Sequence, residues 1–359
     1  MRALKTLCWF VGLLAAWALI VLAAWQGQLR QLSAHSVVAR YFLLAALLAI
    51  PARLLALAGA YLAELLLVGW RRSSLRMLWK PAASVRMDMV TIVMQLLLPQ
   101  RHIGYVLSFG LLYLIGLGTQ QLHHFSATRL LPTWSLQVVC FAVFQSFLRY
   151  WAHRLEHAIP ALWALHKFHH SAESMSLLTS ARTTQLAMGI ETGLVFVPAA
   201  LLTSATAPAP AISSPWFAVA AIFFVYSTFV GINGYFVHSN MTTDYGWIGR
   251  WLLVSPRMHR LHHAKPASYH DSNFTFDLVI WDRLFGTYAA CAPGTDPLTI
   301  PLGLEENPFN AHDTIGGTLR EYFLGTYVVF FQELRKGLPA WMPSRNVAER
   351  RIARFMGSS

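Results

Sequence analysis

The sequence predicts an all-α integral membrane protein with about six transmembrane helices and a cytosolic helical cap. Composition is the first observation, because 55% of the 359 residues are apolar and only 12% are charged, too few charges to cover a soluble domain of this size. The second observation is a series of long apolar segments, and the third is a set of three histidine clusters at helical spacing, which we assign to the cap.

Apolar segments of membrane-spanning length recur along the chain. Leu7–Trp25 is an uninterrupted apolar run, long enough to cross a hydrocarbon layer of about 30 Å. Five further segments are expected to cross: Tyr41–Trp70, Ile103–Gly118, Leu130–Leu148, Leu186–Leu202 and Trp216–Val237. Pro51, Arg53 and Glu64 interrupt the second of the six, so we expect it to be kinked or only partly inserted.

The positive charges set the expected orientation. Arg2 and Lys5 precede the first segment, and a basic stretch from Arg71 to Arg86 follows the second, so the positive-inside rule places both in the cytoplasm. The Pro- and Ser-rich loop 203–215 then joins the last two spans on the opposite side, and all histidine clusters share the cytoplasmic side. This distribution explains the net charge of +12, and the lack of a basic, aromatic-interleaved patch argues against a nucleic-acid partner.

Three histidine clusters carry the predicted chemistry. They are His153 and His157, then His166, His169 and His170, then His259, His262 and His263. Residues three and four apart share one face of a helix, so each cluster presents its imidazoles together. Eight imidazoles exceed the three protein ligands of a catalytic zinc ion, so the sequence predicts a site for two metals. The ligand type alone admits iron, copper, nickel or zinc.

The order of these clusters, with an apolar hairpin before the last, resembles the fatty acid hydroxylase and sterol desaturase superfamily of integral membrane di-iron enzymes. The stretches Asp271–Phe274 and Trp281–Thr287 resemble the closing signature of that superfamily. Two stretches, Tyr150–Arg154 and His169–Glu173, are most similar to the alkylglycerol monooxygenase branch and its bacterial relatives. We expect the polar residues of the closing signature to hold the cap together rather than to act in catalysis.

The resemblance adds a ninth ligand and a chemistry. His238 occupies the last position of a QxxxH or HxxxH motif, whose first position is Gly234 here, with Asn233 beside it. The resemblance implies two iron ions and dioxygen, used to hydroxylate or desaturate a C–H bond of a bilayer lipid such as a fatty acyl chain, an ether lipid or a sterol. Electrons must come from a separate donor, a reduced pterin or a redox protein, because no flavin or nicotinamide fingerprint is present. Ala158 departs from the branch, which has an acidic residue there.

Two carboxylates are candidates for positioning the ligands. Glu156 and Glu173 lie within or just after the clusters, where a carboxylate can accept the second N–H of a ligating imidazole. The alternative is an ion pair with Arg154 or Arg182. His270, in the closing signature, is a candidate outer residue of the site.

We divide the chain into an N-terminal transmembrane region, 1–129, a catalytic region, 130–290, and a C-terminal interfacial or cytosolic segment, 291–359. Thr318–Trp341 is expected to form an interfacial helix, because its apolar run is too short to span. Similarity to bacterial relatives implies a bacterial inner membrane with the metal site on the cytoplasmic side, and no feature indicates an oligomeric state.

Two other functions fit parts of the pattern. In a membrane zinc metallohydrolase, the same histidines would generate a metal-bound hydroxide. A metal or haem transporter would favour ligands within the spans, whereas the histidine clusters lie beyond the ends of the predicted spans.

Overall fold

The computed structural model describes residues 54, 56–97, 134–184, 186–191, 193–195, 198, 231–292 and 294–336. Within these residues the fold is helical, and β-type pairing is limited to two isolated bridges, Leu253 with Leu278 and Ala264 with Leu302. The predicted all-α class is confirmed for this part of the chain.

The predicted membrane segments fall largely outside the described residues. Leu7–Trp25, Ile103–Gly118 and the loop 203–215 lie entirely outside, and the other four segments lie partly outside. Of the helices that the structure does describe, none combines the length and the apolar character needed to cross a membrane. The number of crossings stays a prediction.

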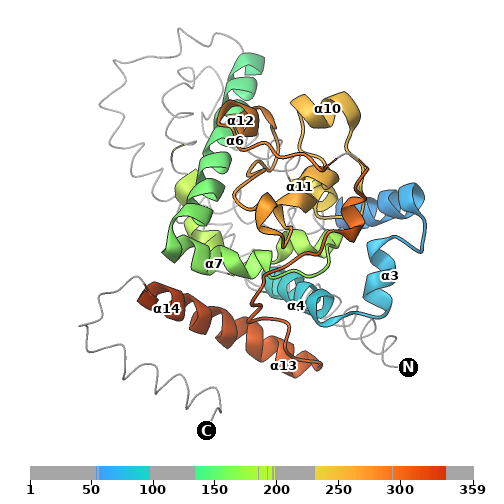
Figure 1. Ribbon diagram of the computed structural model, residues 1–359, viewed down its shortest axis with the longest axis vertical. Helices are drawn as coiled ribbons and strands as arrows, with labels where there is room; N and C mark the ends of the chain where they lie inside the picture. Colours follow the sequence, from blue (N-terminus) through green and yellow to red (C-terminus); the bar gives the residue numbers. More distant parts are fainter. Residues whose placement is uncertain are drawn as a thin grey trace, which may run out of the picture.

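Helices α6 (Trp134–Ala158) and α7 (Pro160–His170) meet at a corner that the sequence dictates. Proline disfavours helical backbone at the residue before it, and Ile159 is accordingly extended, with φ −100° and ψ 117°. Pro160 then begins α7. Backbone N–H groups in the first turn of a helix have no partner within the helix, so proline costs no hydrogen bond there. The corner brings the end of α6, with the first histidine cluster, against α7, which carries the second (Figure 1).

Helix α11 (Pro256–His262) carries the third cluster, and its start is as well defined as that of α7. The Ser255 side chain accepts a hydrogen bond from the Met258 N–H at 3.3 Å, and a proline again occupies the first helical position. The short helices α10 (Gly246–Trp251) and α12 (Ile280–Leu284) are tied together by backbone hydrogen bonds between residues 252–254 and 277–279. Figure 1 shows α10 and α12 at the same end of the molecule.

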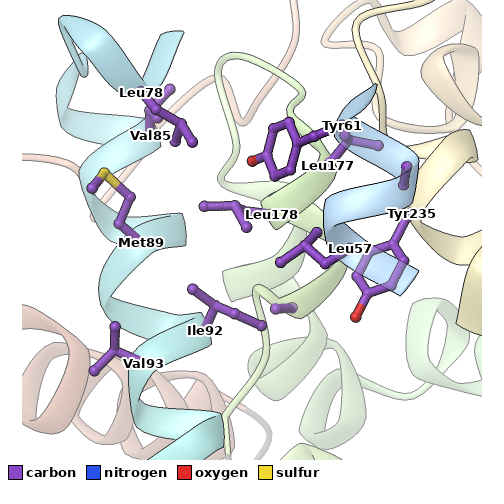
Figure 2. Packing of buried hydrophobic residues seen from close by; sticks show 12 residues of the cluster. Leu57, Tyr61, Leu78, Val85, Met89, Ile92, Val93, Leu177, Leu178 and Tyr235 are labelled. Carbon is purple, nitrogen blue, oxygen red and sulfur yellow. The ribbon is translucent and has the colours of Figure 1, made fainter. Parts of the chain in front are cut away.

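The first hydrophobic core lies between the N-terminal helices and the segment after α7. Helical residues 56–68, α3 (Ser74–Trp79), α4 (Ala83–Leu97) and the 3₁₀ helix η3 (Leu177–Ala181) contribute to it. Figure 2 shows their side chains packed against one another: Leu57, Tyr61, Leu78, Val85, Met89, Ile92, Val93, Leu177, Leu178 and Tyr235. Segments far apart in the sequence are thus joined in one core.

The C-terminal segment forms one continuous helix against α4 and α7. It consists of α13 (Ile315–Arg320), a π-helical turn (Glu321–Gly325) and α14 (Thr326–Lys336). Its inner face buries Tyr322 and Val329 against Phe168 of α7. The helix predicted over Thr318–Trp341 is confirmed as far as Lys336, where the described residues end. Other described elements are the 3₁₀ turns η4 (Ala267–Tyr269) and η5 (Pro297–Thr299) and helical residues 186–191, 193–195 and 231–237.

A fully buried guanidinium ties these layers together. Arg182 donates to Asp88 Oδ1 of α4 at 2.9 Å, to the Phe168 carbonyl of α7 at 3.1 Å and to Asn310 Oδ1 at 2.6 Å. The side chains of Arg182 and Asp88 are both completely inaccessible to solvent. Removing one partner of a buried ion pair leaves an uncompensated charge, so this interaction constrains the packing of α4 against α7.

This geometry predicts a difference between two Arg–Asp pairs that α4 makes. Asp88→Asn keeps the shape of the side chain but leaves the Arg182 charge buried and unpaired, and should lower the free energy of unfolding by about 3 kcal/mol. Arg86 pairs at 3.0 Å with Asp313, which is 98% exposed, so Asp313→Asn should have little effect. Thermal unfolding of both variants in one detergent checks this, and equal effects would contradict it.

Candidate metal centre

All nine histidines predicted as metal ligands gather into two groups, in which every residue except the half-buried His157 is buried. One group is His153, His157, His166, His170 and His262, and the other is His169, His238, His259 and His263. Within each group the possible ligand atoms lie within 4.8 Å of one another. The second and third clusters each divide between the two groups, so α7 and α11 both contribute to each candidate centre.

In the five-histidine group, two imidazoles face each other with unprotonated nitrogens. His153 Nδ1 lies 2.6 Å from the Phe274 carbonyl oxygen, and His166 Nδ1 lies 3.0 Å from Oε2 of Glu156. A carbonyl or a carboxylate oxygen accepts, so each Nδ1 is the donor, and in the neutral ring each Nε2 then carries a lone pair. These two Nε2 atoms are 2.9 Å apart. Two lone pairs at this separation repel each other unless a proton or a metal ion lies between them.

The four-histidine group has the same arrangement. His169 Nδ1 donates to the Arg182 carbonyl at 3.2 Å, and His238 Nδ1 donates to the Gly234 carbonyl at 2.7 Å. Their Nε2 atoms therefore both carry lone pairs and lie 3.3 Å apart. His259 Nε2 lies 2.9 Å from His238 Nε2. A second position where lone pairs converge is thus built beside the first.

Among the residues that the structure describes, four buried ring nitrogens have no hydrogen-bond partner. They are His157 Nε2, His259 Nδ1, His262 Nε2 and His263 Nδ1. A buried polar atom left without a partner costs about 1–3 kcal/mol, and all four belong to the two groups. His262 illustrates the point, because its Nδ1 donates to the Ser272 carbonyl at 2.7 Å and so leaves Nε2 unprotonated. Neutral imidazole nitrogens of this kind are ligands for iron, zinc and copper, so the residues fit metal ions.

Burial favours the neutral, metal-binding form of these side chains. Desolvation lowers the pKa of His238 to about 4 and, with the neighbouring histidines, that of His262 to about 3. The pKa values of His153, His169 and His259 are also lowered well below the usual value, first by burial and then by the surrounding imidazoles. Protons therefore do not compete for the inward-facing nitrogens of these five histidines near neutral pH.

Aromatic rings close the histidine groups from water. Phe276 stacks on His153 with 4.5 Å between ring centroids, and Phe274 packs edge-on against His157 at 5.1 Å. Trp163 of α7 lies against the same His157, also at 5.1 Å. Such a dry surrounding strengthens electrostatic interactions within the site.

The two predicted carboxylates have different surroundings. Glu156 is buried and contacts His166 Nδ1. From this position a carboxylate can fix the tautomer of the His166 ring. Glu173 is exposed, and its carboxylate accepts a hydrogen bond from Asn307 at 2.7 Å. The alternative ion pair with Arg182 is not formed by Glu156 or Glu173, because Arg182 pairs with Asp88.

The Gly234 departure has a structural counterpart. Its carbonyl oxygen orients His238, and an added Cβ there would meet no atom within 4 Å, so the position has room for a side chain that this chain lacks. Asn233 donates its amide to the Phe276 carbonyl at 3.1 Å. His270 is exposed and lies 3.0 Å from the Lys265 carbonyl, outside both histidine groups. The candidate ligands in the described residues are thus divided five and four.

The sequence did not reveal the backbone groups that orient the ligands. The carbonyls of Ser272 and Phe274 accept from two histidines, and Asp282 holds this segment by accepting from the Phe274 and Thr275 N–H groups at 2.8 and 3.0 Å. Asn273 adopts a left-handed φ of 56° and joins the segment to Met258 and Ala289. These contacts agree with the cap-closing role expected for the closing signature. Every residue has a backbone carbonyl, so the sequence does not indicate which carbonyls accept from the histidines.

Comparison with known proteins finds a similar family for this site. The family model described as fatty acid hydroxylase matches residues 138–287, a segment that includes all nine histidines. This segment, less than half of the chain, is similar to the fatty acid hydroxylase family. It falls within the predicted catalytic region, 130–290.

Known relatives of this segment act on lipids, as their names state. The chain is 31% identical over 161 residues to alkylglycerol monooxygenase of Danio rerio, covering 44% of this chain and 32% of that protein. It is 30% identical to the human alkylglycerol monooxygenase, covering 39% of this chain and 28% of that protein. It is also 30% identical to ornithine lipid hydroxylase OlsE of Rhizobium tropici, covering 43% of this chain and 42% of that protein. The chain thus spans less than half of each relative's length, and no solved structure matches it.

Glu156 and Glu173 give a matched pair for testing the geometry of the centre. Glu156→Gln removes the carboxylate that orients His166 and should weaken metal binding by about 10-fold or more. Glu173→Gln should leave metal affinity unchanged, because that carboxylate contacts Asn307. Metal titration of both purified variants checks this. Equal affinities in the two variants would contradict a role for Glu156.

Proposed function

We propose that the chain is a membrane-bound di-iron oxygenase that uses dioxygen to hydroxylate or desaturate a C–H bond of a lipid. The nine histidines of the two groups would hold the two iron ions, five around one and four around the other. Bound iron would supply the reduction of dioxygen and the oxidising power that an unactivated C–H bond demands, with electrons from a reduced pterin or a separate redox protein.

One observation carries the proposal: paired Nε2 lone pairs face each other at 2.9 Å and 3.3 Å in two adjacent groups. A single catalytic zinc ion takes three protein ligands, so one hydrolytic zinc would leave most of these imidazoles without a role. Two adjacent all-imidazole centres, in a segment similar to the fatty acid hydroxylase family, favour a two-metal oxygenase over the metallohydrolase.

The chain's own residues would keep the site neutral, fixed and dry. Five Nδ1 hydrogen bonds, four to backbone carbonyls and one to Glu156, hold the rings so that Nε2 points inward. Phe274, Phe276 and Trp163 exclude water, which protects a reactive oxidant from side reactions. The protein thereby sets the position of the metals before substrate arrives.

A lipid is the substrate class that the remaining evidence favours. Alkylglycerol monooxygenase and ornithine lipid hydroxylase are both named for lipid substrates, and the predicted apolar segments would give a bilayer lipid access to the domain. We propose a bacterial inner membrane as the location, with the metal site on its cytoplasmic side.

Lipidomics under ¹⁸O₂ tests the proposal. Cells that express the chain should contain a lipid heavier by one labelled oxygen, or a lipid that lacks two hydrogens. A His153→Ala, His262→Ala variant that is present at the same level in membranes should produce neither, because two of the five ligands of one group are missing.

Two results would contradict the oxygenase. One is an unchanged lipid profile in cells where the protein is folded and loaded with iron. The other is a purified protein that consumes no dioxygen and hydrolyses a lipid with zinc bound, which would support the metallohydrolase instead.

A further inference from the structure

Short helices at one end of the molecule expose large apolar side chains. We call them, with the residues that join them, the α10–α12 surface. Its apolar members are between 45% and 66% exposed: Trp247, Ile248, Trp251, Leu252, Ile280 and Leu284. The two helices are held together by the hydrogen bonds of Val254 N–H to Asp277 and of Val279 N–H to Leu252. Side chains of this size are normally buried, so a contiguous exposed set indicates an interaction surface.

The backbone fixes the outward orientation of α10. Gly249 is the one buried residue of this helix, and a Cβ there would lie 1.6 Å from the Asp244 carbonyl oxygen. Only glycine permits this close approach, which presses α10 against the preceding loop. The apolar face is then directed away from the protein. Exposure of the two tryptophans follows from the packing of the helix.

Positive charge accompanies the apolar side chains. The guanidinium of Arg283 lies between the rings of Trp251 and Tyr288, at 4.1 and 4.0 Å from their centroids. Arg250 is exposed on the same helix as Trp251. Asp244 is the single exposed acid in residues 244–257 and 280–288, because Asp282 is buried. The surface thus combines indole rings with excess positive charge.

The same end of the molecule carries the apolar half of α6. Trp281 of α12 packs on Phe147 of α6 with 5.2 Å between ring centroids, and its indole N–H donates to Ser146. On α6, Val139 and Val143 are 57% and 40% exposed. These valines belong to the predicted membrane segment Leu130–Leu148. The α10–α12 surface therefore lies beside the part of the chain that is expected to enter the membrane (Figure 1).

We propose that the α10–α12 surface docks on the bilayer and binds anionic phospholipid headgroups, and so seats the histidine-bearing part of the chain on the membrane. Tryptophan is enriched at membrane interfaces because its ring is apolar and its N–H is polar. Arginines beside these exposed apolar side chains add attraction to an anionic leaflet. The proposal does not depend on the metals or on the oxygenase reaction.

Quenching of tryptophan fluorescence by brominated acyl chains tests the surface directly. The full chain would be placed in phosphatidylcholine nanodiscs, with and without phosphatidylglycerol, as wild type and as Trp247→Phe, Trp251→Phe. The double variant should lose a lipid-quenched component of the emission, and that component should grow in wild type when phosphatidylglycerol is added. Trp79→Phe is the matched control, since Trp79 is 45% exposed on α3, and it should keep the component.

Either of two outcomes would overturn the proposal. In one, the Trp247→Phe, Trp251→Phe variant and the Trp79→Phe control show the same lipid quenching. In the other, the emission of Trp247 and Trp251 is quenched by aqueous acrylamide and not by brominated lipid, which would leave the surface facing water or another protein. Neither readout involves dioxygen, so the surface and the oxygenase can fail independently.

Discussion

Burying nine imidazoles in two groups places unprotonated ring nitrogens against one another, and the rest of the described structure must accommodate this repulsion. His153 and His166 face each other at 2.9 Å through Nε2, and His169 and His238 do so at 3.3 Å. In water each lone pair would accept a hydrogen bond, but these four side chains are buried here. Cations relieve this strain directly, because each supplies a common partner for several lone pairs.

The scaffold holds the imidazoles mainly through backbone groups. Carbonyls of Gly234, Ser272, Phe274 and Arg182 each accept from an Nδ1, which turns Nε2 inward. Arg182 makes two kinds of contact. Its carbonyl orients His169, and its guanidinium binds α4, the end of α7 and Asn310. Packing of the helices and orientation of a ligand therefore depend on the same residue. A change in the buried ion pair should reach the centre through this carbonyl.

Much of the centre could be predicted from spacing alone, since residues three and four apart on a helix share a face. The proline at the start of α7 and of α11 also marks where each histidine helix begins. Division of the second and third clusters between two groups could not be predicted, because it depends on how α7 crosses α6 and α11. The exposed position of Glu173 could not be predicted either, because it depends on contacts between segments far apart in the sequence. Its neighbours come from residues near 307, which no local pattern connects to it.

The metal content of the purified chain tests the two-centre account most directly. Wild-type protein, loaded with iron and freed of excess metal, should hold two ions per chain, one for each histidine group. A His259→Ala, His263→Ala variant, which loses half of the four-histidine group, should hold one. A folded wild-type protein that binds one ion or none at saturating iron would contradict the account.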